Sequence, residues 1–88
     1  MATEGISGMP RYYFDLRDTD GVFADEDGLD LRDMEHAQDE AARFLADMAR
    51  IALGKAHDDP IERITIEVRD DDGPVMNMRF TFEIERMR

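Results

Sequence analysis

The spacing of apolar residues changes twice along this chain, and that change most narrowly limits how it can fold. Apolar side chains occupy alternate positions from Tyr12 to Leu16, a period of two that is typical of a β-strand with one buried face. Over residues 34–53 the period becomes that of a helix, about 3.6 residues. It returns to two over 64–68 and 76–84. The sequence therefore predicts strands on both sides of one helix.

The first two strands are predicted to form a hairpin. Asp18-Thr19-Asp20-Gly21 has the composition of a turn, and a short return strand follows over 22–24. A three-residue loop from Thr19 to Gly21 places Leu16 opposite Ala24 and Arg17 opposite Phe23, which keeps residues of like character on one face. A two-residue loop at 20–21 fails this test because it sets Leu16 against Asp25. A second turn is predicted at 25–28.

The helix is predicted from Met34 to Leu53. Its apolar residues fall on one face, namely Ala37, Ala41, Phe44, Leu45, Met48, Ile51 and Ala52. Asp33 has the side chain of a good N-cap, and Gly54 is a natural stop. At about 1.5 Å per residue this helix is roughly 30 Å long.

Two further strands are predicted around the turn at 70–74. A three-residue loop with Gly73 in the left-handed conformation pairs Val68 with Met76 and Ile64 with Phe80. A slide by two residues instead pairs Glu67 with Arg79, which is also acceptable. The sequence leaves both registers open.

The predicted fold is α+β, with the order β-β-α-β-β, a four-stranded antiparallel sheet and the long amphipathic helix packed on one face. Residues 1–9 are predicted to be a disordered tail and 10–88 a single domain. The expected core is Tyr12, Phe14, Leu16, Ile64, Ile66, Val68, Met76, Met78, Phe80 and Phe82 beneath Phe44, Leu45, Met48 and Ile51. In such a core, Phe80→Ala is expected to cost about 3–5 kcal/mol.

Negative charge is concentrated near the first hairpin and the helix start. The segment 15–40 holds eleven acidic residues against two arginines, and it carries nine of the eleven net negative charges of the chain. Such a surface repels nucleic acid and anionic lipid and attracts basic partners. We therefore expect a protein partner rather than nucleic acid or a membrane.

The chain shows no sign of a secreted or membrane protein. Its first ten residues lack a basic start and an apolar stretch, and no apolar run approaches the roughly 20 residues that a membrane span needs. The absence of Cys excludes disulfides and thiolate metal sites. We expect a cytoplasmic protein, whose translation starts at Met1 or at Met9.

Three stretches of this sequence carry a family resemblance: PRYYFDLRD at the start, Asp25-Glu26-Asp27-Gly28-Leu29, and the closing ITIEVRDDDG. With these motifs the chain resembles a family of short acidic bacterial proteins of unknown function, from Pro10 to about Arg86. The resemblance implies no catalytic or ligand residue.

The candidate reaction centres are all weak. The Asp-rich turns that end at Gly21, Gly28 and Gly73 lack the oxygen ligand at the fifth position of an EF-hand loop, so turn chemistry explains them better than a metal site. The two histidines, His36 and His57, make neither a catalytic dyad nor a metal triad. We predict no catalytic residue, no metal, no cofactor and no enzyme activity.

The best predicted contact surface lies on the sheet face away from the helix. Tyr13 and Phe23 are expected to lie there together, beside Arg17, and the acidic turn Asp25, Glu26 and Asp27 is expected to add a binding surface for a basic partner.

Three functions compete on this basis. The first is a non-enzymatic interaction module, binding a protein partner or itself as a homodimer, with a basic partner favoured. The second is a regulator that mimics the charge of nucleic acid and occupies a basic protein. The third, less favoured, is a protein that binds divalent cations in its Asp-rich turns.

Overall fold

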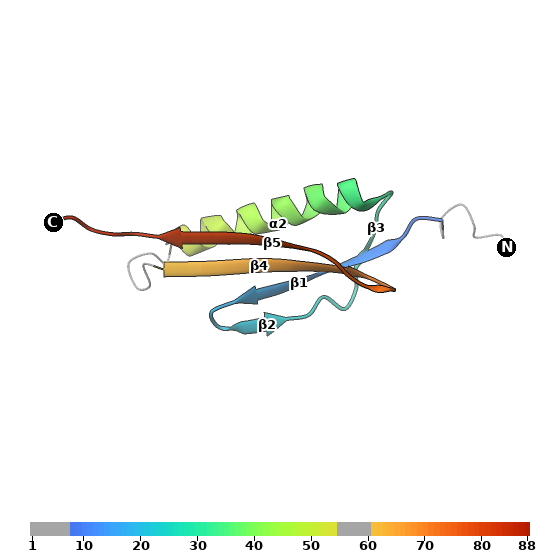
Figure 1. Cartoon of the computed structure of the whole chain (residues 1–88), viewed down its shortest axis with the longest axis horizontal. Helices are drawn as coiled ribbons and strands as arrows, with labels where there is room; N and C mark the ends of the chain where they lie inside the picture. Colours follow the sequence, from blue (N-terminus) through green and yellow to red (C-terminus); the bar gives the residue numbers. More distant parts are fainter. Residues whose placement is uncertain (1–7, 55–60) are drawn as a thin grey trace.

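The computed structural model describes residues 8–54 and 61–88, with only the backbone at 61 and 62. Its elements, in chain order, are β1 (Arg11–Asp18), β2 (Gly21–Phe23), β3 (Leu29–Asp30), α2 (Met34–Gly54), β4 (Ile61–Asp70) and β5 (Gly73–Glu83) (Figure 1). The predicted tail, 1–9, falls mostly outside the described residues, as does His57.

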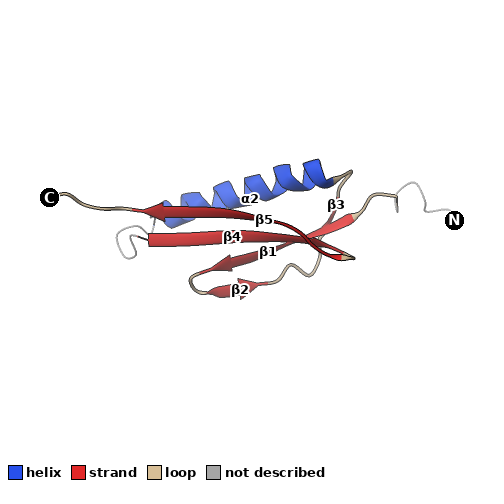
Figure 2. Ribbon diagram, in the orientation of Figure 1, coloured by secondary structure: helices blue, strands red, loops and turns tan. Residues whose placement is uncertain are grey.

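The fold is α+β, as predicted, and the described residues contain one helix, which packs on an antiparallel sheet. The strand order is β2-β1-β4-β5, and β3 pairs with the start of β1. The helix α2 lies across one face of the sheet and packs on β4 and β5 (Figure 2). The predicted count of four strands missed β3, because a strand of two residues within an acidic turn shows no period of two.

The predicted loop of the first hairpin is wrong. Leu16 pairs with Phe23 and Arg17 with Val22, so the turn contains only Thr19 and Asp20. The Asp18 carboxylate accepts the backbone N–H groups of Asp20 and Gly21, which closes the tighter turn. This one-residue change of register moves every side chain of β2 to the face opposite the predicted one.

The second hairpin adopts the first of the two predicted registers. Val68 pairs with Met76, Ile66 with Met78 and Ile64 with Phe80, and Gly73 has a positive φ of 125°. The loop itself is shorter than predicted, because Asp70 pairs with Gly73. A β-bulge beside Val68 restores the register, and it turns both Val75 and Met76 toward the core.

The core is smaller than predicted and lies mainly under the helix. Its buried residues are Tyr12, Phe14, Ala37, Ala41, Leu45, Ala52, Ile64, Ile66 and Val68. Ala37 and Ala41 have no exposed surface, so α2 approaches the sheet through small side chains. The predicted core residues Leu16, Phe44, Met48, Met76, Met78, Phe80 and Phe82 are only half-buried, and Ile51 is 53% exposed. Six of these residues still pack against the core, so the prediction is confirmed in part: Leu16, Phe44, Met48, Met76, Met78 and Phe80. They stay partly exposed because the described helix is too narrow to cover the whole sheet.

The start of the helix forms as predicted. The Asp33 carboxylate accepts the backbone N–H of His36 at 3.0 Å, which is the expected N-cap bond. Its Oδ1 atom also lies 2.7 Å from Nδ1 of the His36 ring. The hydrogen bonds from His36 lower the pKa of Asp33. This aspartate and histidine therefore belong to the helix cap.

Candidate functional site

A network of charged groups fixes the acidic turn to the sheet. Asp15 on β1 accepts a hydrogen bond from Arg69 Nε at 2.8 Å and another from the backbone N–H of Asp25 at 2.8 Å. The Arg69 guanidinium also donates to the Asp25 carbonyl and lies 4.4 Å from the centre of the Tyr13 ring. Hydrogen bonding to Asp15 raises the pKa of Arg69. These contacts join β1, β4 and the segment between β2 and β3.

The Asp25 side chain replaces a missing piece of strand. Between β2 and β3 the chain does not pair with β1. There the Asp25 carboxylate takes the place of a strand backbone and accepts the N–H of Phe14 at 3.1 Å. Its other oxygen accepts the N–H groups of Asp27 and Gly28, which closes the turn. Gly28 has a φ of +72°, and a Cβ there would lie 2.9 Å from the Tyr12 carbonyl oxygen. The turn therefore has one aspartate at its centre, held by backbone donors.

The position of Asp25 changes its acidity. Burial alone raises the pKa of this carboxyl, but the N–H groups of Gly28, Phe14 and Asp27 and the charge of Arg69 outweigh burial and lower the pKa. The contribution of Asp25 to stability is therefore complete above its unfolded pKa, and it disappears as the pH falls through the lower folded pKa.

We expect Asp25→Asn to be less stable than the wild type at pH 7 by about 1–2 kcal/mol, because an amide can replace only part of the hydrogen bonding of the carboxylate. Below pH 3.8, the ordinary pKa of an aspartate, the difference should shrink as Asp25 of the wild type becomes protonated. Urea unfolding of both proteins at several pH values measures this difference. A gap that is constant or widens toward acid would contradict the assignment.

The structure separates the residues of the predicted contact surface. Tyr13 and Arg17 lie on the sheet face opposite the helix, which we call the open face. Phe23 lies on the helix side because it pairs with Leu16, so the predicted pair of Tyr13 and Phe23 is wrong. Asp25 is mainly structural, whereas the side chains of Glu26 and Asp27 are exposed.

An apolar groove runs beside the helix, where α2 leaves part of β1 uncovered. We call it the helix-side groove. Its volume is about 270 Å³, and it is lined by Phe14, Leu16, Asp25, Phe44, Met48 and Ile66. The rings of Phe14 and Phe44 meet edge to face, with centroids 5.3 Å apart. Phe23 does not line the groove itself, but it pairs with the lining residue Leu16 and is 54% exposed.

The apolar groove has an acidic rim. Asp25 lines it on one side, and a smaller hollow of about 80 Å³ continues from Leu16 and Met48 to Asp18 and Asp20. The sequence predicted Leu16, Phe44 and Met48 to lie in the core. The spacing of apolar residues shows which side of a helix or strand faces the core, but it does not show how much of that side a neighbouring element covers. The exposed apolar surface between these acids is the best candidate contact surface.

The pKa shifts of the described residues have causes within the fold. The Asp25, Asp33 and Arg69 side chains have pKa values shifted toward their charged forms, and each shift comes from partners within the fold. Among the residues whose placement is described, no group of three His, Asp or Glu side chains has a geometry that could hold a metal ion. None of the described helices is long and apolar enough to cross a membrane.

Comparison with known proteins identifies a family but no activity. Searches of curated proteins and of solved structures gave no significant match. Residues 11–81, which run from the start of β1 into β5, match the model of a domain of unknown function. The chain therefore belongs to the family described as "Domain of unknown function (DUF6894)".

Proposed function

We propose that this protein is a non-enzymatic interaction module whose helix-side groove binds a basic, amphipathic segment of a partner protein. The observation that carries the proposal is an apolar groove with Asp25 at its side, next to a smaller hollow that is lined by Asp18 and Asp20. Apolar surface of this kind is worth burying, and the surrounding carboxylates select the charge of what covers it.

The apolar part would supply most of the affinity. Leu16, Phe44 and Met48 are only half-buried, and Phe23 and Ile51 are more than half exposed on the same side of the molecule. Burying apolar surface releases about 25 cal/mol per Å². Met48 adds a side chain that adapts to different partners.

The acidic part argues for a partner of opposite charge. Asp18, Asp20 and Asp25 border the groove and its extension, and the whole chain has a net charge of −11. A homodimer through this surface would bring two acidic rims together, which costs free energy. Lysine or arginine residues flanking an apolar stripe would instead complement the rim.

We expect Phe23→Ser to weaken partner binding about tenfold, which corresponds to about 1.4 kcal/mol, because it removes an exposed aromatic ring beside the groove. Val22→Ser is the matched control: Val22 is 53% exposed, pairs with Arg17 and so faces the open side. A synthetic helical peptide with a leucine face and a lysine face serves as the probe, with binding followed by methyl NMR.

The controls separate this proposal from simple charge attraction. A lysine-rich peptide without the leucine face should bind more weakly and should leave the Leu16 and Met48 methyl signals in place. Equal binding of the two peptides, or equal loss in the two serine variants, would contradict the proposal. So would a stable dimer in sedimentation that Phe23→Ser dissociates and Val22→Ser does not, because the occupant would then be a second copy.

A further inference from the structure

Three arginines surround one threonine on the open face of the sheet. Arg17 pairs with Thr65, and Thr65 pairs with Arg79, so these residues form a row across β1, β4 and β5. Arg63 lies two residues from Thr65 on the same face of β4, and it pairs with Thr81. Neighbouring strands lie about 4.8 Å apart and alternate residues about 6.8 Å apart. All three arginine side chains are therefore long enough to reach the space above Thr65.

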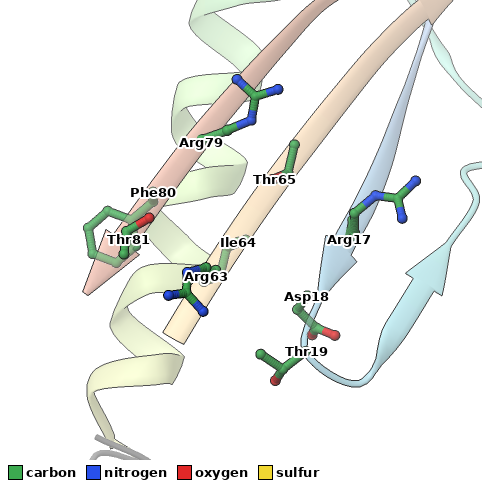
Figure 3. Close-up of a pocket in the computed structure, with 9 residues that line it drawn as sticks. All are labelled: Arg17, Asp18, Thr19, Arg63, Ile64, Thr65, Arg79, Phe80 and Thr81. Carbon is green, nitrogen blue, oxygen red and sulfur yellow. The ribbon is translucent and has the colours of Figure 1, made fainter. Parts of the chain in front are cut away.

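This part of the open face is hollowed. A cavity of about 370 Å³, which we call the arginine hollow, is lined by the three arginines and by Thr65, Thr81 and Asp18 among others (Figure 3). The arginines come from three different strands, and Thr65 lies between Arg79 and Arg17, whose guanidinium points away from Thr65 (Figure 3). A volume of this size lies within the range of small-molecule sites.

The charges in the arginine hollow are only partly neutralised from within. Arg17 Nε donates to Glu67 at 2.8 Å, and this pair is exposed. The carboxylate of Asp18 is engaged by the N–H groups of its own turn. Arg63 and Arg79 are exposed and form no ion pair with any side chain that the structure describes. In a chain with a net charge of −11, cations outnumber carboxylates here.

We propose that the arginine hollow binds a small ligand through a phosphate group. Phosphate presents several oxygens in different directions, and guanidinium groups recognise it through paired hydrogen bonds. The hydroxyls of Thr65 and Thr81 add neutral donors between the arginines. The arginines and threonines of the site lie on the face opposite the helix-side groove, and the proposal does not rest on the interaction function proposed above, although Asp18 and Ile64 line both the arginine hollow and the smaller hollow beside the groove.

The test is a titration of the whole protein, labelled with ¹⁵N, with inorganic phosphate and separately with glycerol phosphate. We expect saturable NMR shifts centred on Thr65 and Thr81. The double variant Arg63→Ala/Arg79→Ala should bind at least about tenfold more weakly, as expected for the loss of charged hydrogen bonds. The control Arg43→Ala/Arg50→Ala removes the same charge from exposed positions of α2 and should bind as the wild type does.

The arms of the experiment identify the ligand class. Tighter binding of glycerol phosphate than of inorganic phosphate indicates a phosphomonoester as the ligand, and equal binding indicates the phosphate group alone. Acetate binding as tightly as phosphate would overturn the choice of phosphate. No saturable shift, or equal loss in the two double variants with unchanged melting temperatures, would overturn the site itself.

Discussion

Phe14→Ala is expected to remove about 3–5 kcal/mol of stability, the largest effect of any substitution that we predict. Phe14 is 7% exposed, packs edge to face on Phe44 of the helix, and pairs with Val68 in the centre of the sheet. A chain of this length has a total stability of about 4–13 kcal/mol, so the substitution removes a large share of it. Urea unfolding followed by far-UV circular dichroism measures the loss.

Phe80→Ala provides the comparison. Phe80 is half-buried on the edge strand β5, where it stacks on Phe82 with ring centroids 6.5 Å apart. Its removal should cost about 2 kcal/mol, less than the 3–5 kcal/mol that a fully buried ring would lose. Equal losses at the two positions would mean that β5 is covered in solution, and the account of a half-covered sheet would then be wrong.

Asp15→Ala is expected to cost about 2–3 kcal/mol, the second largest effect. Asp15 is 9% exposed and receives hydrogen bonds from Arg69 and from the backbone of Asp25. Without it, the Arg69 charge and a backbone N–H lose their partner together. The cost stays below that of a fully buried pair because the Arg69 side chain is 38% exposed.

A double-mutant cycle identifies the interaction. Asp15→Ala and Arg69→Ala should be strongly non-additive, because each removes the same contact. Asp27→Ala removes an exposed carboxylate from the same acidic segment and should change stability by less than about 0.5 kcal/mol. Simple additivity of the first two, or a similar loss in the third, would contradict the assignment of the lost stability to the contact between Asp15 and Arg69.

The acidic turn illustrates what sequence patterns could and could not predict about the candidate site. Composition identified Asp25-Glu26-Asp27-Gly28 as a turn, and the structure confirms it with a positive φ at Gly28. The same composition does not distinguish the three acidic residues of the turn, so all three were predicted to bind a partner. The fold distinguishes them, because the Asp25 carboxylate accepts the N–H of Phe14 and the Asp25 carbonyl accepts a hydrogen bond from the Arg69 guanidinium. These contacts join residues 11 and 44 positions apart in the sequence, which local patterns do not report.

The sequence by itself determined the helix with its Asp33 cap, the faces of β1, β4 and β5, and the α+β class, since these depend on periodicity and on neighbours within a few residues. Only the tertiary structure decided the register of β2, the width of sheet that one helix covers, and the gathering of three arginines around Thr65. A shift of one residue in a turn reverses a whole strand, and the coverage of a sheet depends on where a distant helix comes to rest. Both proposed binding surfaces follow from these tertiary choices.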